Sequence, residues 1–302
     1  MTPVALVLSV DEAEYLEEGL PPLVGQAEVV VIDNACTDDT AAVAAAHGAR
    51  VVRLETRLSY AAAINAGIAA TEGEFVLLVN ADCVVREGFA AALHDAMDAD
   101  PALGSAAPKL LRADAPDEID AVGIVVDWRR KNLLVGHGAP AAAYDSVGPV
   151  FGADGAAALW RRVALEDSAV DGEVLDEDMA LWATESDLAW RARLRGWECA
   201  FVPEAVATHV RTYSPSTPRT LLAPEHRRLQ FRNRLLMVKK NQRFATPGLL
   251  AYEVAALGHA LLRERELLGA YRDVWAARAG TRRRRRVVQA RRKARPPFGL
   301  VP

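Results

Sequence analysis

The chain has 302 residues, of which 51% are hydrophobic and 25% charged, with a formal net charge of -4. This composition is typical of a folded protein of one large or two small domains, and it excludes collagen-like and wholly disordered chains. Three scattered cysteines (Cys36, Cys83 and Cys199) match neither a disulfide framework nor a C-x-x-C motif, which indicates a reducing, cytoplasmic location. We expect neither a signal peptide nor a spanning helix, since the N-terminal apolar run lacks a preceding positive charge and no apolar stretch is long enough.

Charge is unevenly distributed along the chain. Residues 281–302 hold nine Arg or Lys residues and no acid, whereas the first 210 residues hold 35 acids and 14 bases. Because so acidic a surface repels nucleic acid, we expect no nucleic-acid partner. The basic segment is predicted to be a disordered tail that is attracted to an anionic membrane surface, which would place the protein peripherally at the inner face of the plasma membrane.

Short apolar runs alternate with helical segments over the first hundred residues. Such alternation predicts a parallel sheet covered by helices on both faces. Ligands bind beyond the carboxyl ends of the strands in sheets of this kind. The runs predict strands at 4–10, 28–33, 50–54 and 74–80, and helices at 40–47 and 60–70.

The rest of the chain is less regular. Residues 101–160 indicate an irregular or antiparallel part of the same domain. Thr184 and Asp187 make a capping-box-like start for a helix over 185–195, and the next apolar run predicts a strand that ends at Pro203. The chain then becomes helical and basic. We expect an α/β domain over 1–220, a helical extension over 221–280 and the basic tail over 281–302.

Several well-known chemistries lack their fingerprints here, because the sequence holds no G-x-G-x-x-G, P-loop, H-E-x-x-H or G-x-S-x-G motif. What remains is a sheet with acids at its strand ends, then a later acid pair and a His. Over residues 3 to about 242 the chain resembles the family 2 glycosyltransferases, whose fold is called GT-A. The resemblance rests on EVVVIDNACTDDT, RLSYAAAINAGIAATEGEFVLLVNAD, GAAALWRR, LDEDMALWATESDLAWRARLRGW and VPEAVATHV, while RNRLLMVKKNQ is similar to the basic helix of bacterial rhamnosyltransferase-like members.

The resemblance implies a GT-A-like α/β fold with a doubly wound, mostly parallel sheet and a helical, basic C-terminal extension. It also implies an inverting transfer of a sugar from a UDP-, dTDP- or GDP-linked donor to a hydroxyl of a glycan or lipid-linked acceptor, in envelope or exopolysaccharide synthesis. The leaving diphosphate gains negative charge, which Mn²⁺ or Mg²⁺ would stabilise. The implied metal ligands are Asp82, in an N-x-D form of the family's D-x-D motif, and His209.

The implied nucleotide-sugar site lies at the first strand ends. Asp33 would accept hydrogen bonds from the nucleobase or, alternatively, cap the following loop. Near Ser9 and Asp11 the family has an aromatic residue that packs on the base, and Val10 replaces it here. Arg57 is a candidate to compensate for the lost stacking. The full set is Ser9, Asp11, Asp33, Arg57, Asn80 and Asp82.

Two acids near the start of the helix over 185–195 are the candidate catalytic residues. The family presents Glu-Asp where this chain has Thr184 and Glu185, so Glu185 would be the general base that removes the proton of the acceptor hydroxyl. Asp187 matches the family's next acid. Because an acid in a first helical turn also stabilises the helix without any catalysis, we favour a structural role for Asp187.

Three alternatives stay open at this point. A polyprenyl-phosphate sugar synthase would use the same fold with a phosphate as acceptor. A catalytically degenerate relative would bind nucleotide sugar or glycan without turnover, which the departures at Val10, Thr184 and Glu185 allow. Nucleic-acid binding through the tail would depend strongly on salt and would be lost on deletion of residues 281–302.

Overall fold

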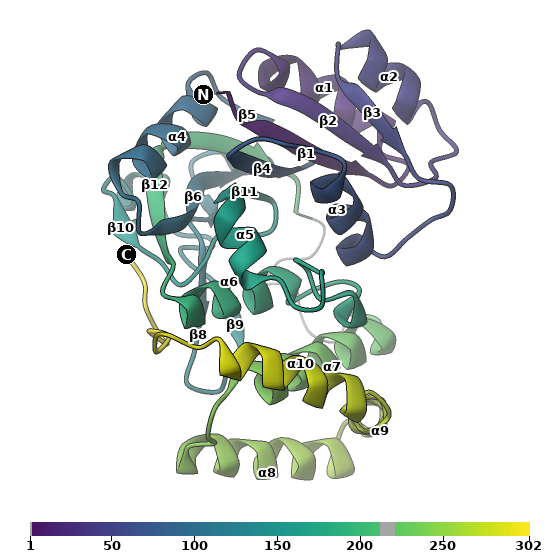
Figure 1. The fold of residues 1–302 in the computed structure, drawn as a ribbon, viewed down its shortest axis with the longest axis vertical. Coiled ribbons are helices and arrows are strands. Elements are labelled where there is room, and N and C mark those ends of the chain that lie inside the picture. The colour runs from purple at the N-terminus through teal and green to yellow at the C-terminus, as the bar shows by residue number, and fades with distance from the viewer. Residues whose placement is uncertain (1, 212–220) are drawn as a thin grey trace.

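A computed structural model describes residues 2–211 and 221–302 (Figure 1). Its first half is a parallel sheet in which β1 lies between β2 and β4, with β3 beyond β2 at the edge. The strands are β1 (Val4–Ser9), β2 (Glu28–Asp33), β3 (Arg50–Arg53) and β4 (Phe75–Asn80), and the helices between them are α1 (Ala13–Val24), α2 (Thr40–Ala46) and α3 (Tyr60–Ala69). The strands and helices predicted here are confirmed to within one residue at each end.

The second half of the sheet mixes parallel and antiparallel strands, as residues 101–160 indicated. β11 pairs antiparallel with both β4 and β6, and β12 pairs parallel with β6. Short strands extend this half, and a separate hairpin lies beside it. The bounds are β5 (Cys83–Val85), β6 (Leu103–Arg112), β7 (Ile119–Ala121), β8 (Ile124–Val126), β9 (Asn132–Leu134), β10 (Gly148–Pro149), β11 (Ala157–Arg161) and β12 (Glu198–His209).

Strand β12 is longer than predicted, since it continues past Pro203 to His209. Its pairing with β6 shifts register between Val202 and Val206. Pro203 lies within this irregularity, where a residue without an N–H group removes no hydrogen bond from the ladder. The extra length brings His209 directly opposite Cys83 of β5.

Helices cover both faces of the sheet. One apolar cluster joins the sheet to α1, α2 and α4 (Phe89–Ala99). The cluster on the opposite face joins it to α3, α5 (Arg162–Ser168) and α6 (Thr184–Arg195). This arrangement is the predicted doubly wound fold (Figure 1).

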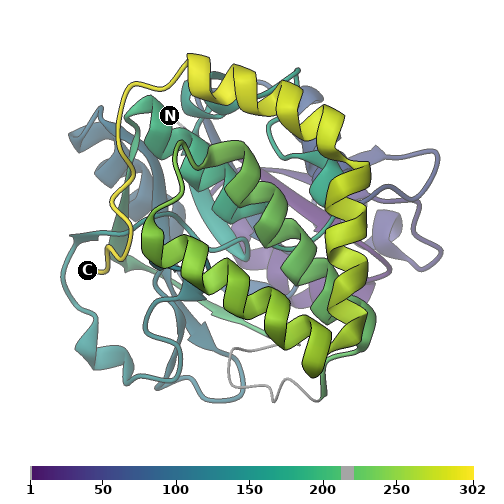
Figure 2. The same cartoon turned by 90° about the horizontal axis from the view of Figure 1, so that it is seen from below.

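The C-terminal helices form a further layer beyond α6, which Figure 2 shows from below with α7 between α8 and α10. They are α7 (Pro224–Asn241), α8 (Pro247–Leu262), α9 (Leu268–Ala276) and α10 (Arg278–Ala290). A third apolar cluster holds the layer, with Trp190 and Leu194 of α6 packed among residues of α7, α9 and α10. Of the helices within residues 2–211 and 221–302, none is both long and apolar enough to cross a bilayer.

The prediction of a disordered tail over 281–302 is wrong for much of that segment. Residues up to Ala290 belong to α10, and beyond it Phe298 stacks on Phe151 with ring centroids 5.9 Å apart. Arg284 forms an ion pair with Glu173 at 2.7 Å. The tail is ordered because its few apolar side chains enter the third cluster and several arginines meet carboxylates of the acidic body. The boundary at 220 adjoins residues 212–220, which lie outside the described residues, and the division at 220 and 280 stays a prediction.

Candidate active site

The loops after β1 and β2 are tied together by polar side chains. Asp11 has a left-handed backbone (φ 59°) and accepts hydrogen bonds from the Thr37 backbone N–H at 2.6 Å and from Arg57 at 2.7 Å. These bonds lower the pKa of Asp11 to about 2. Arg57 also donates to the carbonyl of Asn34 at 3.3 Å. Two predicted nucleotide-site residues, Asp11 and Arg57, therefore meet as an ion pair at the strand ends.

Asp33 and Ser9 are both completely buried. Asp33 accepts hydrogen bonds from the Cys36 backbone N–H at 2.7 Å and from Arg53 at 3.0 Å, and so closes the loop after β2. The Arg53 guanidinium is exposed above it and was not among the predicted site residues. The Ser9 hydroxyl contacts the Thr40 hydroxyl at 2.9 Å. The Ser9 hydroxyl thus packs in the loop interior, and its contact with a nucleotide stays a prediction.

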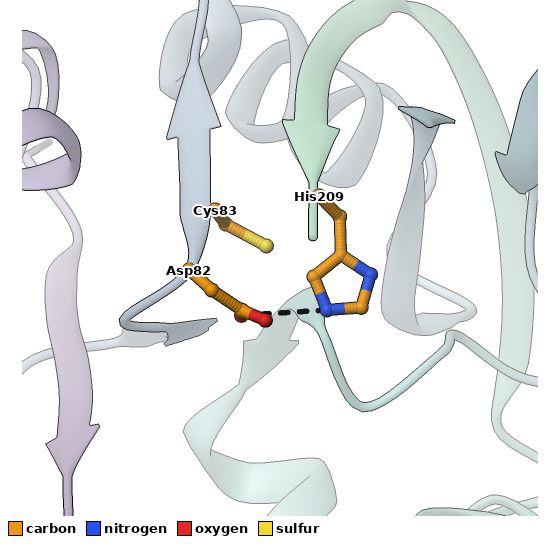
Figure 3. A group of neighbouring side chains, drawn as sticks. All are labelled: Asp82, Cys83 and His209. Atoms are coloured by element: carbon orange, nitrogen blue, oxygen red, sulfur yellow. Dashed lines mark ion pairs between the residues drawn. The ribbon is translucent and has the colours of Figure 1, made fainter. Parts of the chain in front are cut away.

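The candidate metal ligands lie together where β5 and β12 pair (Figure 3). Asp82 Oδ1 is 3.4 Å from His209 Nε2, and the ligand atoms of Asp82, Cys83 and His209 all lie within 4.8 Å of one another. The Cys83 thiol donates to the Ala156 carbonyl at 3.4 Å, and burial raises its pKa well above the usual value. Because Mn²⁺ and Mg²⁺ prefer oxygen and imidazole ligands to a thiol, Asp82 and His209 are the pair that suits a hard divalent cation.

A buried carboxylate behind His209 was missed by the sequence analysis. Asp120 in β7 accepts a hydrogen bond from His209 Nδ1 at 2.8 Å and two from Arg211 at 2.7 and 2.8 Å. Burial alone would raise the pKa of Asp120, but these bonds outweigh it and lower the pKa to about 2. A carboxylate in this position fixes the imidazole so that its other nitrogen faces Asp82, as in many metal sites. The one signal in the sequence is an acid inside an apolar run.

The contacts of His209 with Asp120 and Asp82 also change the pKa of its imidazole. Burial alone would lower the pKa of His209, but hydrogen bonds with Asp120 and Asp82 outweigh it and raise the pKa to about 9. Arg211 follows two residues later on the same side of the extended chain and also reaches Asp154, at 3.0 Å. The site therefore combines three carboxylates with an imidazole and a guanidinium at one sheet edge.

A cavity of about 870 Å³ opens beside this cluster, between the sheet and the C-terminal helices. Of the predicted site residues, Asn80, Glu185 and His209 line it. Ser9 and Asp33 instead end β1 and β2, and Asp11 and Arg57 belong to the loops after β1 and β3. The other lining residues near the sheet, none of them predicted, are Tyr60, Asp154, Gly155, Trp182 and Arg211.

Glu185 projects into the cavity from the first turn of α6. Burial raises its pKa above the ordinary value, while a hydrogen bond with Tyr60 acts in the opposite direction. A Cβ atom on Gly155 would lie 2.8 Å from the Glu185 carboxyl group, so a larger residue there would displace this carboxyl group. A carboxylate with a raised pKa at a cavity wall has the properties of a general base.

The turn before α6 has an unusual backbone. Ala180, Trp182 and Ala183 all have positive φ angles of 57°, 63° and 59°, which residues with a side chain rarely adopt. The side-chain amide of Asn233 in α7 donates to the carbonyls of Met179 at 2.6 Å and Leu181 at 2.7 Å. Helix α7 therefore holds the turn that presents Trp182 and Glu185 to the cavity.

Asp187 does not line the cavity, which corrects its place among the catalytic candidates. It is completely buried and accepts hydrogen bonds from Arg191 at 2.8 Å, Lys240 at 2.8 Å and Asn241 at 2.7 Å. The predicted capping box is also wrong, because the N-cap residue is Ala183 and makes no side-chain cap bond. The carboxylate instead joins α6 to α7.

Comparisons with known proteins agree with this architecture. Residues 5–121 match the model of glycosyl transferase family 2. Uncharacterized glycosyltransferases of Mycobacterium bovis and Mycobacterium tuberculosis are 42% identical over 72 residues, which is 24% of this chain and 33% of theirs. The match thus spans about a third of the length of these relatives.

Solved structures share the fold at low sequence identity. A crystal structure of GalNAc-T7 with UDP, GalNAc and Mn²⁺ has a TM-score of 0.61 and 15% identity, over 80% of this chain and 48% of that one. The mannosyltransferase PcManGT from Pyrobaculum calidifontis, with GDP-Man and Mn²⁺, has a TM-score of 0.52 and 20% identity, over 92% and 76%. Residues 1–349 of S. aureus TarS with UDP-GlcNAc have a TM-score of 0.60 and 16% identity, over 96% and 91%. Residues 5–121 are therefore similar to glycosyl transferase family 2, and the chain shares the GT-A fold of these solved structures.

Proposed function

We propose that this protein transfers a sugar from a nucleotide-diphosphate donor to an acceptor hydroxyl, with inversion. The observation that carries the proposal is the meeting at one cavity of His209, which is paired with Asp82 and backed by Asp120, and of Glu185 with its raised pKa. Neighbours of the same fold are complexes with UDP or GDP-Man and Mn²⁺. A UDP-, dTDP- or GDP-linked sugar is the donor class that follows.

The two candidate ligand side chains at the sheet edge fit a divalent cation. Asp82 supplies a carboxylate and His209 an imidazole held by Asp120, a combination that suits Mn²⁺ and accepts Mg²⁺. Such an ion supplies stabilisation of the negative charge that develops on the departing diphosphate. Arg211, which also lines the cavity, adds a positive charge from the protein itself.

Glu185 acts on the acceptor in this proposal. Its carboxylate takes the proton of the acceptor hydroxyl while the acceptor oxygen forms a bond to the anomeric carbon, and the bond from that carbon to the diphosphate oxygen breaks. One displacement of this kind inverts the anomeric centre. A hydroxyl of a glycan or of a lipid-linked saccharide meets this requirement, and envelope or exopolysaccharide synthesis is the process that uses such acceptors.

The test measures binding and turnover separately. Thermal shift with UDP-, dTDP- and GDP-sugars, with and without Mn²⁺, should show stabilisation that needs both components. Asp82→Asn should abolish the metal-dependent part, while Asp98→Asn, at an exposed site on α4, should retain it. Release of nucleoside diphosphate in the presence of candidate acceptors then reports transfer. Equal Mn²⁺-dependent binding by Asp82→Asn and the parent would overturn the metal assignment.

Two outcomes of this test would favour the alternatives. Metal-dependent donor binding without release of nucleoside diphosphate under any condition would support a binding protein. A polyprenyl-phosphate acceptor is already ionised and needs no base, so full transfer to such a phosphate by Glu185→Gln would support the synthase.

A further inference from the structure

Helix α8 is apolar yet barely packed against the rest of the protein. Of its sixteen residues only Leu249 and Ala260 are buried. Side chains three or four positions apart on a helix share a face, and here they form an exposed apolar stripe without a charged residue. We call this surface the α8 stripe, which consists of Leu250, Val254, Leu257 and Leu261, with exposed fractions of 55%, 73%, 41% and 49%.

Each end of α8 pairs a further exposed apolar side chain with an arginine. Phe244, 72% exposed, precedes the helix, and the Arg243 guanidinium lies over its ring at 5.1 Å. Leu262, 82% exposed, ends the helix and is followed by exposed Arg263. An apolar face flanked by cationic side chains is typical of a helix that lies in the interface of a bilayer.

Positive charge is concentrated in the C-terminal part of the chain, which contains α8, and negative charge in the rest. Residues 221–302 hold 20 basic and five acidic residues, whereas residues 1–220 hold 16 basic and 35 acidic residues. Four of the five acids in the C-terminal part are ion-paired, and they are Glu253, Glu264, Glu266 and Asp273. A negatively charged surface would therefore attract the layer that carries α8 and repel the acidic body.

The same helix forms a wall of the cavity. Tyr252, Ala256 and His259 of α8 line the cavity that holds Glu185, while the α8 stripe faces away from it. Figures 1 and 2 show α8 as the outermost helix of its layer, far from the α1 and α2 side of the sheet. A surface on which α8 rests would thus lie next to the cavity.

We propose that the α8 stripe docks this protein on a bilayer that contains anionic lipid. Charge complementarity and the exposed apolar side chains both favour this partner over a neutral surface. Docking does not require turnover. Its consequence, that a lipid-linked acceptor reaches Glu185 from the membrane side of the cavity, rests on the proposed function.

Flotation with vesicles tests the docking directly. The full chain should float with vesicles of phosphatidylcholine mixed with phosphatidylglycerol and stay in the load fraction with phosphatidylcholine alone. The double variant Val254→Gln/Leu261→Gln should lower partitioning to the anionic vesicles roughly ten-fold or more, because two apolar side chains are lost from the interface while net charge is unchanged. Gln is a good helix former, so α8 is retained.

A matched control tests whether the loss of any two exposed apolar side chains would lower flotation. Val147→Gln/Val163→Gln changes two valines of the acidic body, 62% and 50% exposed, and should float like the parent. Circular dichroism and Mn²⁺-dependent donor binding confirm that each variant is folded, and they report on the proposed function independently of docking. Parent-like flotation of the α8 variant would overturn the proposal. So would a parent that never floats but forms a dimer that the α8 variant loses, since the occupant would then be a second copy.

Discussion

The side-chain amide of Asn233 donates a hydrogen bond to the carbonyl of Leu181, 2.7 Å away, and so connects α7 to the turn before Glu185. The amide makes further bonds to the carbonyls of Met179 and Trp182 at 2.6 and 3.1 Å. One buried side chain thereby satisfies three carbonyls of a turn with three positive φ angles. The basic helix that resembled rhamnosyltransferase-like members thus supports the site and does not enter it at this position.

Replacement of Asn233 should impair catalysis more than donor binding. Asn233→Asp keeps the shape but places an acceptor against three carbonyls, so the turn should relax and Glu185 should lose its position. We expect kcat for transfer to fall about 10- to 100-fold, since a small misplacement of a catalytic group has such an effect, with little change in Mn²⁺-dependent donor affinity. Asn65→Asp is the control, because Asn65 also clamps a loop, through Leu175, without lining the cavity. A parent-like kcat in Asn233→Asp would show that the turn before α6 keeps its conformation without the hydrogen bonds from Asn233.

Asp120→Asn should weaken the metal site without removal of a ligand. The amide keeps one acceptor oxygen but no charge, so at least one of the three hydrogen bonds from His209 and Arg211 would be lost and the imidazole would be less well oriented. Loss of such a partner typically costs about 10- to 100-fold in metal affinity. Titration of Mn²⁺ in the presence of nucleoside diphosphate measures the change. Asp117→Asn changes an exposed acid in the turn before β7 and should bind Mn²⁺ like the parent, and an equal loss there would make the effect nonspecific.

The strands and helices of the first half could be predicted because each depends on local sequence, whereas Asp82, His209 and Glu185 were proposed from the family resemblance. A continuous apolar run forms a buried strand, and residues that end parallel strands gather at one edge. The partners of these residues could not be predicted in the same way. Asp120 meets His209 across 89 positions, and Arg53 covers Asp33 from a neighbouring strand.

Two of the corrected local predictions have the same cause. Thr184 and Asp187 have capping-box spacing, yet Asp187 turns to Lys240, 53 positions away, and forms no cap. The arginines of the tail suggest disorder by composition, yet Arg284 and Arg291 pair with acids of the body, including Asp167 at 3.1 Å. In both places a long-range ion pair decided the structure, and local patterns do not encode such pairs.

Asp187→Asn should lower the stability of the fold and should not change the catalytic step directly. Without the carboxylate, Arg191 and Lys240 keep their charges in a buried site, and a broken buried pair costs about 3 to 5 kcal/mol in the free energy of unfolding. Urea unfolding with matched donor-binding measurements at low denaturant would separate the two effects. Asp114→Asn, in an exposed pair with Arg112, should leave the unfolding midpoint nearly unchanged.

The same carboxylate should make stability depend on pH in the acid range. Burial alone would raise the pKa of Asp187, but Lys240 and Arg191 outweigh it and lower the pKa. The contribution is therefore fully present above the unfolded-state pKa of about 3.9 and is lost as pH falls through the lower folded-state pKa. Below about pH 4 the parent should lose stability more steeply than Asp187→Asn, and parallel pH profiles would contradict the assignment.

The last prediction concerns the base itself. Burial raises the pKa of Glu185, and only its deprotonated form can accept the proton of the acceptor, so kcat should fall as pH decreases through this raised pKa. Glu185→Gln should lower kcat by about 10²- to 10⁴-fold with donor binding nearly unchanged. Tyr60→Phe removes a hydrogen bond that favours the charged carboxylate, so the acid limb of the pH profile should move to higher pH.

Tyr15→Phe, at an exposed position on α1, is the control for the loss of a hydroxyl and should keep the parental profile. The measurement is single-turnover transfer at saturating donor and Mn²⁺ across the acid range, because product release then cannot hide the chemical step. An unshifted acid limb in Tyr60→Phe, together with parental turnover in Glu185→Gln, would exclude Glu185 as the base. Asp154, which also lines the cavity and pairs with Arg211 at 3.0 Å, would then be the carboxylate to test.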